Sequence, residues 1–211
     1  MGDQVSPWLV IPARGLAAGK TRLAAVLTQG ERHALNARLL GHVLGVIGTL
    51  GALERCLVVS PCEETLALAR SRGAATLHEQ GGADPLNAAL EQARDHLRRR
   101  GVGRIVVLPA DLPSLSAQAV RTLLELSTPP GRVVIAPDID ELGTNALALD
   151  ADMTFDYRFG VDSFARHLET AEALDLPVFV HRDPALAFDL DTPADYRLWS
   201  TSRAADIAAA R

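Results

Sequence analysis

The feature that most constrains the fold is an alternation of short, wholly apolar segments with longer segments of helical periodicity. A strand that is apolar throughout has both faces buried, and strands that alternate with helices pair mostly in parallel. The apolar segments before residue 140 are 8–13, 56–60, 74–77, 104–111 and 132–138. The helical segments between them are 31–50, 84–100 and a stretch that begins near Ser116. The sequence therefore predicts an α/β fold of three layers, with a mostly parallel, Rossmann-like central sheet.

The pattern is less regular after Pro137. Residues 146–150 and 177–180 resemble strands, and residues 163–174 have helical periodicity. The sequence "SPCE" (60–63) is typical of a capping box with Pro in the first helical turn, and "TPAD" (192–195) is expected to cap a final helix. There is no internal repeat, low-complexity tract or long linker. We therefore expect a single domain over residues 1–211.

Composition excludes several classes of protein. With 211 residues, of which 48% are hydrophobic, the chain can bury a full core. Its net charge of −5 does not favour binding to nucleic acid or to an anionic membrane. No segment approaches the roughly 20 apolar residues of a membrane helix, and the first residues lack the features of a signal peptide. The two cysteines, Cys56 and Cys62, do not form a metal or disulfide framework. We expect a cytoplasmic protein.

The stretch "IPARGLAAGKTRLA" (11–24) has the small residues and the Gly-Lys-Thr of a nucleotide-binding loop. A Walker A loop needs four residues between its first Gly and the Gly-Lys pair, because that length wraps backbone amides around a phosphate. Here only three residues separate Gly15 from Gly19, and Arg14 stands where the first Gly should be. The spacing predicts a phosphate-binding loop of a different geometry.

Ligands of open parallel sheets bind beyond the carboxyl ends of the strands, and polar residues gather at three such ends. Cations follow the first strand, and carboxylates follow two later ones; the residues are Arg14, Lys20 and Arg22, then Asp111, then Asp189 and Asp191. Alternate residues of an extended segment share a face, so the last two carboxylates should point the same way. This combination suits a nucleoside triphosphate bound with Mg²⁺, because hard divalent cations prefer oxygen ligands.

Each residue also has a simpler interpretation. Asp111 could be a turn or helix-cap aspartate, and Asp191 could join Thr192 in capping the last helix. Lys20 and Arg22 could form a solvated helix start, although cations there are mildly disfavoured without an anion. No Ser or Cys lies in a nucleophile-elbow sequence, and no histidines have metal-ligand spacing. The combination, rather than any one residue, points to nucleotide chemistry.

Six segments together resemble a known family. They are "RGLAAGKTRLA", "DPLNAAL", "VVLPADLPSL", "LGTNAL", "FGVDSFARH" and "DLDTPADY". In this order they resemble the 2-phospho-L-lactate guanylyltransferase family of coenzyme F420 biosynthesis, with its phosphoenolpyruvate and 3-phosphoglycerate variants. That family belongs to the MobA-like nucleotidyltransferase superfamily. The chain departs from the family in having Arg14 in place of a Lys, and Leu142 in place of a Gly before "GTN".

The resemblance implies roles for individual residues. The carboxylates of Asp111, Asp189 and Asp191 are expected to hold Mg²⁺. Fixed positive charge for the triphosphate is expected from Lys20, Arg14 and Arg22. The phospho-acid would bind at the "GTN" loop and the "FGVDS" segment, through Thr144, Asn145, Gly160 and Ser163. GTP would contact Ala13, Gly15, Lys20 and Pro109, with its guanine near Asn87.

The implied reaction transfers GMP from GTP to the phosphate of a small phospho-hydroxy acid and releases pyrophosphate. A phosphate monoester is mostly dianionic at neutral pH, so the attacking oxygen needs no general base. Three alternatives remain open: a P-loop phosphotransferase using "GKT", another MobA-like enzyme acting on a molybdenum cofactor precursor or a sugar phosphate, and a non-catalytic binding module. The sequence does not choose among 2-phospho-L-lactate, phosphoenolpyruvate and 3-phospho-D-glycerate, nor between a monomer and a homodimer.

Overall fold

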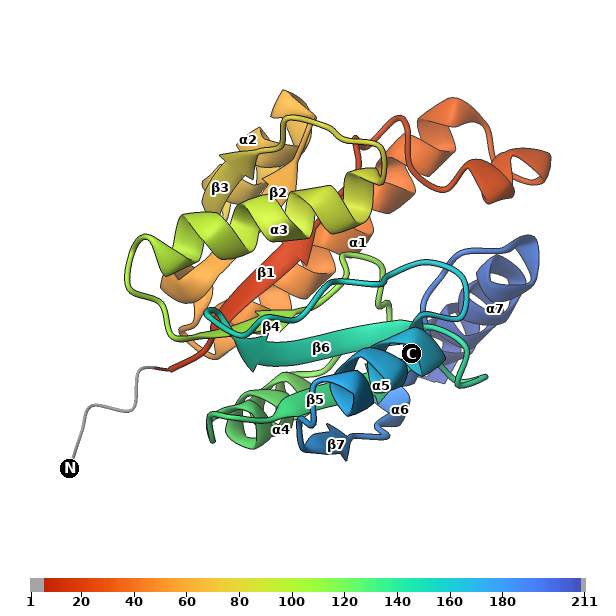
Figure 1. Ribbon diagram of the computed structural model, residues 1–211. Helices are drawn as coiled ribbons and strands as arrows, with labels where there is room; N and C mark the ends of the chain where they lie inside the picture. Colours follow the sequence, from red (N-terminus) through yellow and green to blue (C-terminus); the bar gives the residue numbers. More distant parts are fainter. Residues whose placement is uncertain (1–5, 210–211) are drawn as a thin grey trace.

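The computed structural model describes residues 6–209, with only the backbone described for residues 202–209. Seven strands form one sheet in the order β3-β2-β1-β4-β6-β5-β7 (Figure 1). Their bounds are β1 Trp8–Pro12, β2 Cys56–Ser60, β3 Ala75–His78, β4 Arg104–Val107, β5 Val133–Pro137, β6 Thr144–Asp150 and β7 Val178–Val180. All strand pairs are parallel except the two that β6 makes with β4 and β5. The predicted α/β fold with a mostly parallel sheet is confirmed.

Helices cover both faces of this sheet. They are α1 Gln29–Thr49, α2 Glu63–Ser71, α3 Pro85–Arg98, α4 Ala117–Ser127, α5 Ser163–Ala173, α6 Pro184–Ala187 and α7 Pro193–Ala209, with two short 3₁₀ helices, η1 Thr21–Ala25 and η2 Leu53–Arg55. One core cluster joins the sheet to α1, α2 and α4, and a second joins it to α3 and α5, which cross the front of the sheet in Figure 1. The predicted three layers are present.

The strands supply both cores because their side chains alternate between the two faces. In β1, Leu9 and Ile11 belong to the cluster under α1, and Val10 belongs to the cluster under α3. All three are at most 1% exposed. Burying such a side chain stabilises the fold by about 1.5–3 kcal/mol, so strands that are apolar on both faces are strongly held in the centre of the sheet.

The direction of β6 places its first residues at the edge of the sheet where the parallel strands end, which is the edge expected to bind ligands. Thr144 pairs with Pro137 at the end of β5, and Leu147 pairs with Val107 at the end of β4. Because β6 is antiparallel to both neighbours, it begins at the edge where the parallel strands finish. The "GTN" segment is therefore not a loop as expected, since Thr144 and Asn145 are the first two residues of a buried strand.

The segment predicted as a strand over residues 104–111 is shorter in the structure. β4 ends at Val107, and the Leu108 amide still donates to the Val10 carbonyl at 2.9 Å. Pro109 has no N–H with which to continue the ladder, so the chain leaves the sheet there. As a result Asp111 lies on a turn beyond the strand end and is free to face other loops.

Helix capping was only partly predicted. The expected box at residues 60–63 is wrong: Cys62 is the N-cap of α2 and makes no side-chain capping bond, while the Ser60 hydroxyl accepts from the Cys62 amide at 3.1 Å. A capping box is found instead at Thr28 and Glu31, so α1 begins before the predicted residue 31.

Two further expectations concern the chain as a whole. Within residues 6–209, no helix is both long enough and apolar enough to span a membrane. The single domain over residues 1–211 stays a prediction, and its first five and last two residues lie outside the described part of the chain.

Candidate active site

The loop after β1 is closed by its own backbone. The amides of Ala18 and Gly19 both donate to the Gly15 carbonyl at 3.0 Å, and the Ala13 amide donates to Val59 of the neighbouring strand at 2.9 Å. This folds the loop back over the end of β1 in a tight turn. The loop therefore has a fixed shape of its own, shorter than a Walker A loop, as its spacing predicts.

Asn36 of α1 holds this loop in place through a side-chain hydrogen bond. Its side-chain amide donates to the Leu16 carbonyl at 2.6 Å. A Cβ added to Gly19 would lie 2.8 Å from the Asn36 nitrogen, so a larger residue there would have to push the Asn36 side chain away from this hydrogen bond. The next residue, Lys20, has φ 58°, the left-handed conformation, at the start of η1. The anchored loop and the left-handed backbone of Lys20 together direct the Lys20 side chain toward the end of the sheet.

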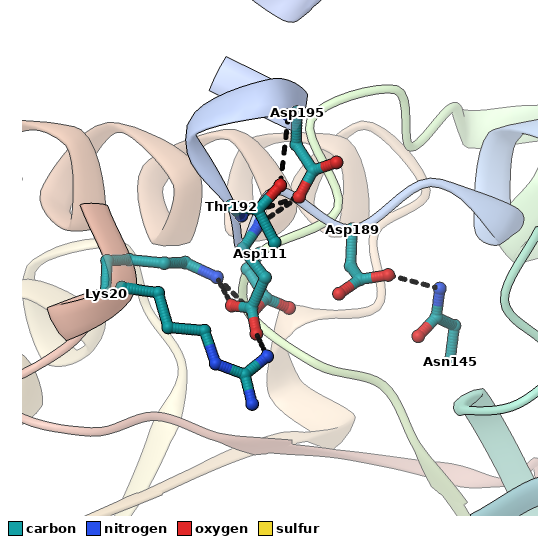
Figure 2. Close-up of polar contacts among 8 residues, drawn as sticks. Lys20, Asp111, Asn145, Asp189, Thr192 and Asp195 are labelled. Carbon is teal, nitrogen blue, oxygen red and sulfur yellow. Dashed lines mark hydrogen bonds and ion pairs between the residues drawn. The ribbon is translucent and has the colours of Figure 1, made fainter. Parts of the chain in front are cut away.

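Lys20 is the centre of a charge cluster. Its Nζ lies 2.5 Å from Asp111 and 2.7 Å from Asp191, and its side chain is only 6% exposed (Figure 2). Arg22 approaches the second oxygen of Asp191 at 3.6 Å, and it is 71% exposed. Three segments distant in the sequence thus meet at this edge of the sheet. The simpler interpretation of Lys20 as part of a solvated helix start is excluded.

The cluster changes the acidity of its members in opposite directions. Burial alone would lower the pKa of Lys20, but the charges of Asp111 and Asp191 outweigh burial and raise it above its ordinary value. Burial would raise the pKa of Asp191, but Lys20, Arg22 and Arg14 together lower it. Both shifts favour the charged forms. The ammonium and the Asp191 carboxylate are therefore ionised at neutral pH.

The two carboxylates are not used as caps. The N-cap of α4 is Ser116, whose hydroxyl accepts from the Ala119 amide, so Asp111 is not needed there. At the start of α7, Asp195 accepts from the Asp191 amide at 3.0 Å and from the Thr192 amide at 2.6 Å. The predicted cap in "TPAD", formed between Thr192 and Asp195, is confirmed (Figure 2). The Asp191 side chain takes no part in it and pairs with Lys20.

Asp189 lies beside this cluster and is held by Asn145. The Asn145 amide donates to an Asp189 oxygen at 3.4 Å and to the carbonyls of Leu186 and Ala187 at 2.9 and 3.2 Å. Burial and the nearby charge of Asp111 raise the pKa of Asp189 to about 6, against the opposing effect of the Asn145 hydrogen bond. Three carboxylates thus repel one another at one edge, which is typical of a site that attracts cations.

The carboxylates have donor chemistry that fits Mg²⁺. Mg²⁺ usually binds through one or two carboxylates together with substrate phosphates, rather than in an all-protein cage. Asp111 and Asp191 already share one cation, the Lys20 ammonium. Within the described residues, no group of three or more His, Cys, Asp or Glu residues is arranged to hold a metal ion. The fit is therefore to a two-carboxylate site completed by phosphate oxygens.

The residues expected to bind the acid lie near one another on β6 and at the start of α5. Ser163 is the first residue of α5 and is 2% exposed, and its amide donates to the Gly160 carbonyl at 3.2 Å. Gly160 has φ +119°, which a residue with a side chain rarely adopts. Thr144, 6% exposed, hydrogen-bonds His167 one turn further along α5. The expected helix start at Ser163 is confirmed.

Asn87, expected near the guanine of GTP, has a side chain that bonds to other parts of the protein. Its side chain accepts from the Phe159 amide at 2.9 Å and donates to the Phe159 carbonyl at 3.1 Å. It also donates to Asp84 at 2.6 Å. The amide therefore fastens α3 to the segment before Gly160, and it does not line the cavity. Its contact with guanine stays a prediction.

A cavity of about 360 Å³ lies between the first loop and the end of β4. It is lined by eight of the predicted residues, namely Ala13, Arg14, Gly15, Lys20, Arg22, Pro109, Asp111 and Asp191. The other predicted residues do not line it, namely Asn87, Thr144, Asn145, Gly160, Ser163 and Asp189. Phe159 lines the cavity and directly precedes Gly160, so it joins the two groups.

Sequence reasoning missed two residues that build this site, Asn36 and His167. Both lie within helices, where a polar residue usually faces water and attracts no attention. The sequence signal for Asn36 was weak, because its partner Leu16 is 20 residues away. His167 had a stronger signal, since it ends the segment "FGVDSFARH" that carries the family resemblance.

Comparison with known proteins decides the family. The model of the family described as "Guanylyl transferase CofC like" matches residues 8–198. The chain belongs to this family. Phosphoenolpyruvate guanylyltransferase of Sphaerobacter thermophilus is 39% identical over 88% of each chain. The 3-phospho-D-glycerate guanylyltransferase of Phenylobacterium zucineum is 37% identical, over 88% of this chain and 86% of its own. The 2-phospho-L-lactate guanylyltransferase of Methanothermobacter thermautotrophicus is 35% identical, over 88% of this chain and 80% of its own.

Solved structures give the same fold. The CMP:2-keto-3-deoxy-manno-octonic acid synthetase complexed with CTP has a TM-score of 0.65, covering 95% of this chain and 99% of its own at 14% identity. At that identity the likeness shows only the fold. The family match adds the class of enzyme, a nucleotidyltransferase of the guanylyltransferase type, as expected from the sequence.

Proposed function

We propose that this enzyme transfers GMP from GTP to the phosphate of a small phospho-hydroxy acid, releasing pyrophosphate, in coenzyme F420 biosynthesis. The observation that carries the proposal is the buried Lys20 ammonium held between Asp111 and Asp191, at the end of the cavity that the first loop lines. Such a site offers both a fixed cation for a triphosphate and carboxylates for its metal ion.

The chemistry requires charge neutralisation and alignment. A phosphate oxygen of the acid attacks the α-phosphorus of GTP in line, the bond to the β-phosphate bridging oxygen breaks, and pyrophosphate leaves with that oxygen. The acceptor is already dianionic, so no side chain has to remove a proton. Lys20, Arg14 and Arg22 supply positive charge where two anions must meet, and an already positioned charge stabilises the transition state most effectively.

Asp111 and Asp191, with Asp189 beside them, would hold Mg²⁺. The metal ion would supply further positive charge to the phosphates during transfer. Lys20 lies between two of these carboxylates, 2.5 Å from Asp111 and 2.7 Å from Asp191, so its charge would add to that of the metal ion.

The acceptor is a three-carbon acid that carries both a carboxylate and a phosphate. The relatives named above act on phosphoenolpyruvate, 3-phospho-D-glycerate and 2-phospho-L-lactate, which share these two anionic groups. The positive dipole at the start of α5 suits an anion, and the amides of Ser163 and Phe164 already donate to the carbonyls of Gly160 and Leu142, so side chains would supply the direct contacts. Thr144, Asn145, Gly160 and Ser163 would bind it there, beside the metal site.

The deciding experiment incubates the enzyme with GTP, Mg²⁺ and each of the three acids, and measures pyrophosphate release and the new phosphoanhydride by phosphorus NMR. Pyrophosphate with one acid supports the proposal. GDP with inorganic phosphate would instead indicate a P-loop phosphotransferase. Pyrophosphate release only with a sugar phosphate or a molybdenum cofactor precursor would indicate another MobA-like enzyme.

We also propose that the enzyme acts in the cytoplasm as a monomer or a homodimer, without binding nucleic acid or membrane. The net charge of −5 supports the last two points. Light scattering after size-exclusion chromatography would measure the oligomeric state, and a larger assembly would contradict the proposal.

A further inference from the structure

His167 occupies a buried position between the segments proposed to bind the acid. It lies four residues after Ser163 on α5, so the two side chains share one side of the helix. The ring is 0% exposed and packs against Phe155, at 5.9 Å between centroids, and edge-on against Phe159, at 4.9 Å. A polar ring in such a place must satisfy both of its nitrogens.

Each ring nitrogen has one partner, and the partners differ in kind. The backbone amide of Arg158 lies 3.0 Å from Nε2, and the hydroxyl of Thr144 lies 2.9 Å from Nδ1. A backbone amide can only donate, so Nε2 must accept and carries no proton. A neutral imidazole then carries its proton on Nδ1. The geometry therefore makes Nδ1 the donor and Thr144 Oγ1 the acceptor.

The surroundings hold the ring in this neutral form. Protonation would place an Nε2 proton against the Arg158 amide proton, which is a contact between two donors. Burial, and then the positive charges of Arg166 and Arg158, lower the pKa of His167 to about 4. At neutral pH the ring is consequently an uncharged Nδ1–H donor.

The direction of this hydrogen bond fixes what Thr144 can offer a substrate. A threonine hydroxyl has one proton and two lone pairs. Within the described residues, His167 is its one hydrogen-bond partner, so the hydroxyl proton stays free to be donated. In the opposite arrangement the proton would point at the ring, and lone pairs would face the anion. Only the arrangement in which Nδ1 donates makes Thr144 a donor to a carboxylate or phosphate oxygen.

We infer that His167 is a positioning residue that holds the Thr144 hydroxyl as a hydrogen-bond donor for an anionic group of the acid substrate. The same ring, through the Arg158 amide, fixes the segment that leads to Gly160, and Asn87 holds that segment at Phe159 from the other side. Strand β6 and the Gly160 segment are thereby set relative to each other. The inference rests on the proposed function for the identity of the anion.

The tautomer can be measured without any substrate. Nitrogen NMR of the wild-type protein labelled with ¹⁵N-histidine should show one histidine that is protonated on Nδ1 and unprotonated on Nε2 at neutral pH. Its signals are assigned by their loss in a His167→Asn variant. A ring of the opposite tautomer, or one that is charged at neutral pH, would overturn the inference.

Kinetics of a matched pair of variants test the role. His167→Asn keeps an amide nitrogen at the position of Nδ1, and His167→Leu has the same branching without a donor. With His167→Leu the KM for the acid should rise by about tenfold or more, as expected for a lost hydrogen bond that fixes a donor to a charged group. The KM for GTP should change little, and His167→Asn should recover most of the loss.

A double variant separates positioning from general stability. If His167 acts through the hydroxyl, adding His167→Leu to Thr144→Val should raise the acid KM little further, because the hydroxyl is already absent. Fully additive effects, equal effects of the Asn and Leu variants, or parallel changes in both KM values would mean that His167 only supports the fold.

A failure of the proposed function can be told apart from a failure of the inference about His167. If wild-type enzyme releases no pyrophosphate with any of the three acids, the acid is not the group that Thr144 binds. The NMR result still decides whether His167 fixes the hydroxyl as a donor. Circular dichroism of each variant confirms that the kinetics report folded protein.

Discussion

The Nζ atom of Lys20 lies 2.7 Å from an Asp191 carboxylate oxygen, although the two residues are 171 positions apart in the chain. They meet because the first loop and the loop before α7 both lie beyond the carboxyl edge of the sheet. The backbone also joins the two carboxylate loops, since the Leu190 amide donates to the Asp111 carbonyl at 3.1 Å. The charge cluster is thus part of the architecture as well as of the site.

Replacing Lys20 by methionine should destabilise the fold and abolish most activity. The change leaves two carboxylates without their shared cation. Loss of one partner of a fully buried pair costs about 3–5 kcal/mol, and partial exposure should reduce this to about 1–3 kcal/mol, because Asp111 and Asp191 are 29% and 42% exposed. Urea unfolding measures the change.

Magnesium should partly replace the missing charge in Lys20→Met. Thermal unfolding with and without Mg²⁺ should show a larger increase in Tm for the variant than for the wild type. Arg22→Gln is the control: Arg22 is 71% exposed and 3.6 Å from Asp191, so its loss should cost less than about 1 kcal/mol. Equal losses in the two variants would contradict a special role for Lys20.

Asp111→Asn should fold normally and lose turnover. The substitution keeps the shape of the side chain but removes a negative charge from the proposed metal site, and we expect kcat to fall by about a hundredfold or more. Asp95→Asn is the matched control, since Asp95 is exposed on α3 and pairs only with Arg98 among the described residues. Wild-type turnover of Asp111→Asn at saturating Mg²⁺ would exclude Asp111 as a metal ligand.

Ser163→Ala should weaken binding of the acid and leave GTP binding unchanged. Because the N-cap of α5 is Asp162, the alanine removes a hydroxyl without removing a cap. Losing a hydrogen bond to an anion should raise the KM for the acid by about tenfold. Thr170→Ala is the control, because it removes a hydroxyl from the same helix that, among the described residues, donates only to the Arg166 carbonyl. It should change neither KM. If both KM values of Ser163→Ala rise together, this segment does not bind the acid.

His167 should make stability fall as the pH is lowered. Its pKa is about 4 in the folded protein, against about 6.5 for a histidine exposed to water. Above pH 6.5 the ring is neutral in both states and contributes no pH dependence. Between these values only the unfolded chain takes up the proton, so the free energy of unfolding decreases by at most about 1.4 kcal/mol per pH unit.

Denaturant unfolding at a series of pH values measures this slope. His167→Asn, which does not titrate, should give a shallower curve between pH 6.5 and about 4, and a parallel one above pH 6.5. Thr144→Val alters the same contact but keeps the imidazole, so its curve should retain the slope. An unchanged slope in His167→Asn would mean that the ring is not held neutral.

Much of the fold was predictable because it follows from local patterns. A wholly apolar run such as residues 56–60 is stable only as a buried strand, and that strand was found with the predicted bounds. The short spacing from Gly15 to Gly19 excluded a Walker A loop, and the loop indeed has another geometry. These features depend on the hydrophobic pattern and the spacing of a few neighbouring residues, and such local properties do not require knowledge of the rest of the fold.

What the sequence by itself determined is therefore the strands, the longer helices and the chemical types at the strand ends, but not the short helices η1, η2 and α6. The tertiary structure decided how they meet. The antiparallel direction of β6, which brings Thr144 to the functional edge, depends on pairing with β4 and β5 across the whole sheet. The tautomer of His167 depends on an amide nine residues away, and the ionisation of Lys20 on carboxylates at positions 111 and 191. Such properties belong to pairs of groups, and only the folded chain fixes the distances between them.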